Sequence, residues 1–166
     1  MSEPRRLLVA IAGTEDIGLP DQVAKVVGAG GPDLEIILLH VSEIAPRELA
    51  AFDPGVRRGP WPLPRREAVE QRLASADDEG TAALLALWHE RFAAALPNAQ
   101  IGHLVARGRP EQEVVAAAGR LHPDAIALCA RPRPGPTEPG PRSLGHVARF
   151  VVDHSPVPVL IIRRAT

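Results

Sequence analysis

The sequence has no tyrosine, one cysteine and one lysine among its 166 residues, and aromatic residues make up 3% of it. So few aromatic side chains argue against an RNA-binding surface or a sugar-binding groove, because both rely on rings that stack. The single cysteine, Cys129, excludes an internal disulfide and a cysteine-rich zinc site. Long apolar runs are also missing, so no segment predicts a membrane span.

The charge of the chain is nearly balanced, with 19 basic and 20 acidic residues and a formal net charge of −1. This balance gives no electrostatic reason to expect binding to nucleic acid or to an anionic membrane. The N-terminal segment MSEPRRLLVAIAG lacks the long apolar region and the cleavage site of a secretory signal. We therefore expect a cytoplasmic protein with a single domain that spans residues 1–166.

Short apolar runs predict the strands of the fold. They are continuous rather than alternating, which is typical of strands buried on both faces of a parallel sheet. The four strongest runs cover residues 7–13, 34–41, 124–130 and 157–162. A weaker run at 101–108 has the character of an edge strand.

Helical patterns alternate with these runs and cover residues 19–29, 65–96, 110–121 and 142–154. We expect Gly80 to interrupt the longest helix, Pro110 to occupy a first helical position, and Ser143 to act as an N-cap. Strands that alternate with crossover helices predict an α/β fold with a doubly wound parallel sheet.

Two proline-rich segments match no helix or strand. Residues 43–64 form a connection longer than the ordinary loops of α/β folds. Residues 131–141 form a Pro/Gly-rich loop before the last predicted helix. Five prolines lie between positions 132 and 141, and each removes a backbone N–H donor.

Four blocks of sequence resemble the universal stress protein (UspA-like) family. They are LLVAIAGTED, EIILLHV, RGRPEQEVVAAAGRLHPDAIAL and LGHVARFVVDHSPVPVLII, in that order along the chain. The resemblance implies a five-stranded parallel sheet with helices on both faces. It also implies a homodimer paired through the last strand, which carries Val157, Val159 and Ile161. We expect a stress-response role exerted through contacts with a protein partner.

Many members of this family bind ATP through a pattern of Gly, two residues, Gly, nine residues, Gly, then Ser or Thr. The glycines let the backbone approach the phosphates, and a helix N-terminus adds positive potential. Aligned on the strand at 124–130, the chain has Cys129 at the first glycine and Pro132 at the second. Gly145 matches the third glycine, His146 takes the Ser/Thr position, and the loop is three residues longer than the pattern.

The nucleoside side of the family site is also altered. An aspartate that ends the first strand in the family is replaced by Ala12, although Gly13 and Thr14 remain. Val41 matches the strand end whose backbone meets the adenine. The loss of several hydrogen bonds of about 1.5–3 kcal/mol each would remove micromolar affinity. We therefore predict no bound cofactor, with ATP the one ligand left open.

An alternative keeps a nucleotide site. An alignment counted backward from Gly145 recovers Gly135 and places Pro132 at the first glycine. Three arginines could then replace the missing backbone donors, since guanidinium groups bind phosphate bidentately. They are Arg131, Arg133 and Arg142. In this alternative the protein is an ATP- or AMP-binding stress sensor.

Catalysis and metal binding are weaker hypotheses. Ser143, His146 and Asp153 could form a hydrolase site, but Ser143 is a natural helix cap. We predict no enzyme activity, with weak ATP hydrolysis left open. No two of the six histidines lie at i, i+4 on one helix with a carboxylate partner, so we predict no metal site.

Two further features have a simple and a functional interpretation. Cys129, at the carboxyl end of a strand, is either a small buried filler or a thiol activated by a nearby helix N-terminus, and we favour the filler. Trp61 and the four arginines within 57–66 either pack on the domain's own surface or bind a partner, and we favour the first.

Overall fold

The computed structural model describes residues 5–13, 18–28, 31–42, 66–130 and 144–163, and the side chains of this part except those of 66–77. The proline-rich segments 43–64 and 131–141 therefore lie outside the described residues. None of the described helices is long and apolar enough to cross a membrane.

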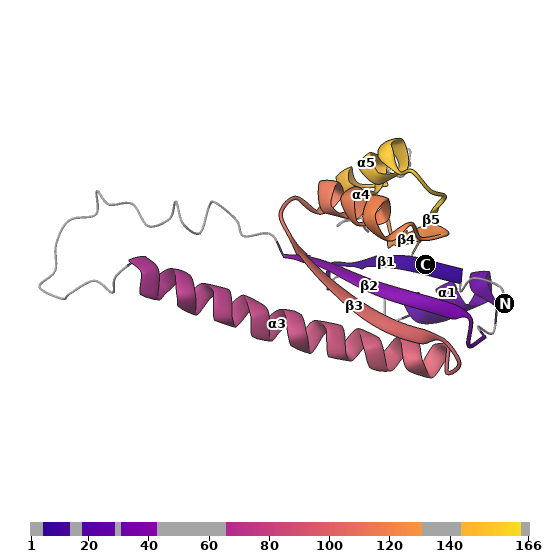
Figure 1. The fold of residues 1–166 in the computed structure, drawn as a ribbon, viewed down its shortest axis with the longest axis horizontal. Coiled ribbons are helices and arrows are strands. Elements are labelled where there is room, and N and C mark those ends of the chain that lie inside the picture. Colours follow the sequence, from indigo (N-terminus) through magenta and orange to yellow (C-terminus); the bar gives the residue numbers. More distant parts are fainter. Residues whose placement is uncertain (1–4, 14–17, 29–30, 43–65, 131–143, 164–166) are drawn as a thin grey trace, which may run out of the picture.

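Five parallel strands form one sheet in the order β3-β2-β1-β4-β5 (Figure 1). The strands are β1 (Arg5–Ile11), β2 (Leu34–Ser42), β3 (Gln100–Arg107), β4 (Ala125–Cys129) and β5 (Val159–Ile162). The chain adds strands on one side of β1 and then crosses to the other side, where β4 pairs with β1 from Leu7↔Ala125 to Ala10↔Leu128. The predicted doubly wound sheet is confirmed, and β3 is an edge strand as expected.

The four described helices are α1 (Leu19–Val27), α3 (Arg66–Ala95), α4 (Pro110–Leu121) and α5 (His146–His154). Pro110 is in the first turn of α4, as predicted. The last helix begins four residues later than predicted, and its N-cap is Gly145 rather than Ser143. Gly145 has φ of +87°, a backbone conformation that glycine adopts at no steric cost.

The last strand is shorter than the predicted run 157–162 because a local turn occupies its first residues. The Ser155 hydroxyl accepts a hydrogen bond from the Val157 amide at 3.1 Å and donates to the Val157 carbonyl at 2.6 Å. These bonds use the backbone groups of Val157 locally, so the ladder with β4 begins only at Val159.

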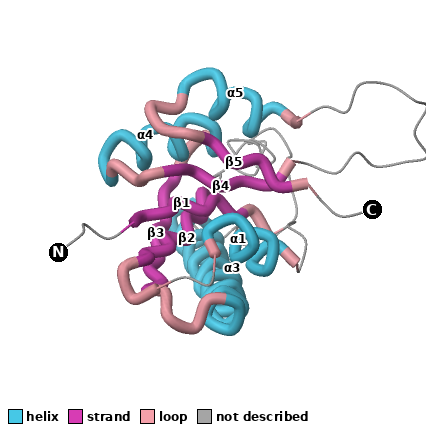
Figure 2. The backbone as a smooth tube through the Cα atoms, turned by 90° about the vertical axis from the view of Figure 1, so that its right-hand side faces the viewer, coloured by secondary structure: helices cyan, strands magenta, loops and turns pink. Residues whose placement is uncertain are grey.

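Helices cover both faces of the sheet (Figure 2). One core cluster lies between the sheet and the pair α1 and α3, and it includes Val9, Leu38 and Phe92. The other lies between the sheet and the pair α4 and α5, and it includes Leu8 and Val151. Successive residues of a strand point to opposite faces, so the continuous apolar runs supply both clusters.

Helix α3 is a single 30-residue helix that continues through Gly80, so the predicted interruption is wrong. The C-terminal half of α3 is held by a buried stripe at helical spacing, which consists of Thr81, Leu85, Trp88 and Phe92. Leu84 packs over Gly13, just beyond the carboxyl end of β1. Figure 1 shows the N-terminal half of α3 extending past this edge of the sheet.

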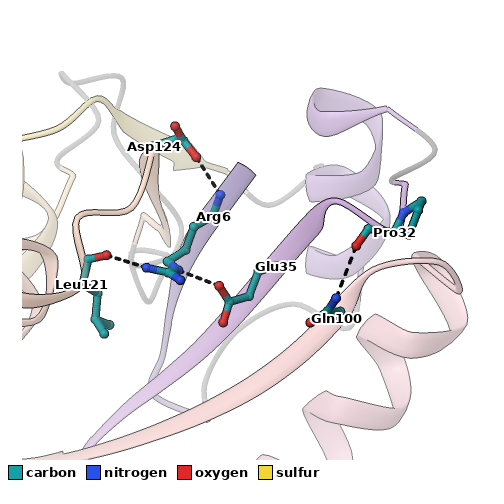
Figure 3. Close-up of polar contacts among 6 residues, drawn as sticks. All are labelled: Arg6, Pro32, Glu35, Gln100, Leu121 and Asp124. Carbon is teal, nitrogen blue, oxygen red and sulfur yellow. Dashed lines mark hydrogen bonds and ion pairs between the residues drawn. The ribbon is translucent and has the colours of Figure 1, made fainter. Parts of the chain in front are cut away.

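A polar network closes the opposite, amino-terminal edge of the sheet around Arg6 (Figure 3). The Arg6 side chain donates to Glu35 on β2 at 2.6 Å and to the Leu121 carbonyl at the end of α4 at 2.8 Å. The Arg6 amide donates to the Asp124 carboxylate at 2.6 Å. A cation at a helix C-terminus is favourable, and the network ties β1, β2 and α4 together away from the carboxyl ends of the strands.

Candidate functional site

The carboxyl ends of β1 and β4 form the topological switch point of this sheet. The chain leaves β1 toward α1, which packs on one face of the sheet, and α5, which follows β4, packs on the other face. Open α/β sheets bind their ligands at the strand ends where such a change of face occurs. The predicted site residues that the structure describes lie just after β1, in the last residues of β2 and β4, or at the start of α5. The strand register brings the three strand ends to one edge.

Ala12 and Gly13 follow β1 directly and are both exposed. The methyl group of Ala12 offers no charge or hydrogen bond to a ligand at this edge. Gly13 has φ of +85°, and a Cβ there would lie 3.4 Å from Leu84 Cδ1. Val41, at the end of β2, is half-buried and packs against the cluster under α4 and α5. Thr14 lies outside the described residues.

Cys129 ends β4 and packs against the cluster under α1 and α3, where it is partly buried. This placement supports the interpretation of the residue as a small apolar filler, since its side chain is part of the core that contains Phe92 and Trp88.

The start of α5 is the part of the predicted phosphate loop that the structure describes. Gly145 caps the helix and His146 is its first residue, with 73% of the His146 side chain exposed. The other loop positions lie outside the described residues, and they are Arg131, Pro132, Arg133, Gly135 and Arg142. The structure thus brings Ala12, Val41 and His146 to one edge of the sheet and leaves the arginines untested.

A buried carboxylate lies beside the start of α5. Glu111, in the first turn of α4, has a side chain that is only 6% exposed. Its Oε1 accepts a hydrogen bond from Arg109 Nη2 at 2.8 Å and lies 3.6 Å from His146 Nε2. An ion pair with a protonated His146 would therefore join the N-termini of α4 and α5.

Comparison with known proteins assigns the chain to a family. The model of the universal stress protein family matches residues 4–163. The chain belongs to the universal stress protein family. The resemblance predicted from the four sequence blocks is confirmed, although no curated protein sequence matched the chain.

Solved universal stress proteins have the same fold. The UspA protein from Lactobacillus plantarum is 19% identical, with a TM-score of 0.62 and with 98% of this chain and 100% of that chain covered. A family protein from Arabidopsis thaliana with AMP bound is 20% identical, with a TM-score of 0.62, and the match covers 98% of this chain and 94% of that chain. The universal stress protein from Archaeoglobus fulgidus in complex with dAMP is 14% identical, with a TM-score of 0.51, and the match covers 97% of this chain and 99% of that chain.

In this universal stress protein domain, neighbouring groups lower the pKa of the Glu111 carboxyl. The backbone hydrogen bond of its own amide lowers the pKa of the Glu111 carboxyl, and Arg109 and His146 lower it further, against the opposing effect of burial. No motif in the sequence singles out Glu111. Its burial depends on the packing of α4 against α5, which no local pattern reports.

Acid should remove the stabilisation that Glu111 provides. Because the folded-state pKa is lowered, the contribution is present above the unfolded-state pKa of about 4.3 and is lost as the pH falls through the folded-state value. We expect Glu111→Gln to lower the free energy of unfolding by about 1–3 kcal/mol at pH 7, and this deficit to shrink as the pH is lowered toward about 3. Urea titrations at both pH values measure it.

The control is Glu79→Gln, the same substitution at an exposed carboxylate on α3. It should change the free energy of unfolding at pH 7 by no more than about 0.5 kcal/mol. A deficit for Glu111→Gln that stays constant across the pH range would contradict this role of the charge.

The residues of the hydrolase hypothesis do not come together on α5. His146 and Asp153 lie two turns apart on the helix, which separates them by about 10 Å along its axis. Near the end of the helix, His154 Nδ1 forms a hydrogen bond with the Phe150 carbonyl at 2.9 Å, and its ring stacks on the Phe150 ring. Ser143 and Trp61 lie outside the described residues.

Proposed function

We propose that this domain is a non-catalytic, homodimeric universal stress protein that acts through protein contacts and does not bind ATP in the manner usual for its family. The single observation that carries the proposal is the buried carboxylate of Glu111 beside the first residue of α5. A helix N-terminus at a switch point is otherwise a favourable place for phosphate.

Electrostatics explain why this carboxylate opposes a phosphate group. Glu111 and an incoming phosphate are both anions, and like charges close to a partly buried site repel strongly. Arg109 is already paired with Glu111 Oε1 at 2.8 Å. A phosphate at the start of α5 would therefore have to compete with the carboxylate for Arg109.

The nucleoside side of the candidate site supports the same proposal. The Ala12 side chain has no group that could bind a ribose hydroxyl, whereas a carboxylate at this position accepts hydrogen bonds from it. Cys129 contributes to the core rather than to an open phosphate cradle. The nucleotide would therefore lose contacts at both of its ends.

Isothermal titration with ATP tests the proposal. We expect no binding with a micromolar dissociation constant. The binding free energy should therefore be less favourable than about −8 kcal/mol. Parallel titrations with AMP and adenosine separate recognition of phosphate from recognition of the nucleoside. A micromolar dissociation constant for any of the three, or a nucleotide that copurifies with native protein in mass spectrometry, would refute the loss of the site.

The second candidate function is a nucleotide-binding sensor, and the AMP and dAMP complexes of two structural neighbours favour it. In this case the loop arginines would replace the missing glycines as phosphate ligands. The replacement of Arg131, Arg133 and Arg142 by alanine should then abolish any nucleotide binding that the wild-type protein has. Equal binding by the triple variant would exclude this mechanism.

The open edge of β5 supports the homodimer. β5 ends the sheet, and its residues Val159, Leu160 and Ile161 stay partly exposed although they pack against the two cores. An apolar edge strand left open is prone to pair with another strand, and a second copy related by a twofold axis would cover it. In such a dimer the two sheets would continue into each other.

A further inference from the structure

Two histidines from different elements face each other at the β3 side of the sheet. His89 lies on α3 and His103 on β3, and His89 Nδ1 is 3.0 Å from His103 Nε2. The ring centroids are 5.0 Å apart and the ring planes cross at 80°. His103 is exposed and His89 half-buried, so solvent ions reach the pair.

Rigid elements hold both rings in place. His89 directly follows the buried Trp88 in the packed half of α3, and Phe92 in the same half belongs to the core cluster against the sheet. His103 lies within the parallel ladder of β3 with β2, opposite Leu38. Sites that are built on helices and strands keep their geometry better than sites on loops.

The separation of the two nitrogens matches the spacing of two ligands on one metal ion. Zinc–imidazole bonds of about 2.0–2.1 Å place two nitrogens about 3.3 Å apart in tetrahedral geometry. A square-planar ion with similar bonds places neighbouring nitrogens about 2.9 Å apart. The observed 3.0 Å lies between the two, so the nitrogens already have the separation of two neighbouring ligands, and a rotation of each ring would direct both lone pairs at one ion.

The contact between the two rings can be exchanged for two bonds to a metal ion. Without a metal, one of the two facing nitrogens carries the hydrogen of the N–H···N contact. On metal binding this hydrogen moves to the other nitrogen of its own ring, and both facing lone pairs bind the ion.

We propose that His89 and His103 bind a transition-metal dication, Zn²⁺ or Cu²⁺, at the edge between α3 and β3. Imidazole ligands favour these ions over Mg²⁺ and Ca²⁺, which prefer oxygen ligands. No group of three or more histidine, cysteine or acidic side chains suited to a metal occurs among the described residues, so water completes the coordination. The proposal is independent of nucleotide binding, because the pair uses residues of α3 and β3 only.

Titration of tag-free full-length protein with ZnCl₂ in a calorimeter tests the site. We expect one Zn²⁺ per chain, and we expect His89→Gln and His103→Gln each to weaken binding by roughly tenfold or more. The matched control is His154→Gln, which changes an exposed histidine on α5 and should bind Zn²⁺ as the wild-type protein does. The absence of Zn²⁺ binding, or binding that either substitution leaves unchanged, overturns the proposal.

A second measurement locates the ion without any substitution. In ¹H–¹⁵N spectra of the histidine rings, Zn²⁺ should shift the ring nitrogens of His89 and His103 and leave those of His154 in place. Shifts that are confined to other histidines would assign the ion elsewhere and overturn the proposal. This readout also decides the question if one of the glutamine variants fails to fold.

Discussion

The Ile161→Pro variant is expected to sediment as a monomer at concentrations at which we expect the wild-type chain to sediment as a dimer. Pro158 and Ile162 direct their carbonyls to β4, where they accept hydrogen bonds from the Ile126 and Ala130 amides at 2.9 Å. Because neighbouring residues of a strand direct their backbone groups to opposite sides, the Ile161 N–H points to the open edge. Proline at this position removes a donor to the partner strand and leaves the ladder with β4 intact.

The expected size of this effect follows from symmetry. Each copy loses one hydrogen bond of about 0.5–1.5 kcal/mol, so the dimer loses two and should be roughly tenfold to hundredfold weaker. The clash of the proline ring with the partner strand adds to this loss. Sedimentation velocity over a range of protein concentrations measures the change in the dimer dissociation constant.

The opposite edge of the sheet provides the matched control, Val105→Pro on β3. The Gly108 amide donates to the Ser42 carbonyl at 3.2 Å, so the Val105 N–H, three residues earlier, points away from β2. This variant should dimerise like the wild-type protein. Monomeric wild-type protein, or a dimer that only Val105→Pro disrupts, would show that β5 is not the interface.

The Phe92→Ala variant is expected to lower the free energy of unfolding by about 3–5 kcal/mol. Phe92 is fully buried between α3 and the sheet, and its ring centroid lies 6.4 Å from that of Trp88. Alanine removes most of the buried ring and leaves a cavity that the rigid sheet cannot fill. Since domains of this kind are stable by only about 5–15 kcal/mol, the loss is a large fraction of the total.

Urea unfolding at one fixed protein concentration measures this loss, because dimerisation would otherwise shift the apparent stability. The control is Leu87→Ala on the same helix, whose side chain is 44% exposed. Leu87→Ala should lower the free energy of unfolding by less than about 1 kcal/mol. Similar losses for both variants would mean that the C-terminal half of α3 does not pack as described.

Much of the fold could be predicted from the sequence because its patterns are local. A continuous apolar run such as 34–41 encodes burial on both faces, and Pro110 marks the start of α4. The predictions for Gly80 and Ser143 were wrong because weak local signals compete with other signals there. Gly80 lowers helix propensity by only about 1 kcal/mol, which the rest of a long helix easily offsets, and Gly145 rather than Ser143 caps α5.

The candidate site was predictable only in part. The family motifs located Ala12, Val41 and His146 at positions that the parallel register brings to one edge. The charged neighbour of His146 in the described part of this edge, Glu111, precedes it by 35 positions and belongs to another helix. Only the packing of α4 beside α5 places its carboxylate at the start of α5.

The sequence by itself determined the family, the order of strands and helices, and the loss of the usual ATP motif, because each of these depends on residue type and spacing along the chain. Tertiary structure alone decided which polar groups meet. Glu111 meets His146, and His89 meets His103, only because neighbouring elements pack side by side. Distances between side chains on different elements depend on strand order and helix packing, which one-dimensional spacing does not record.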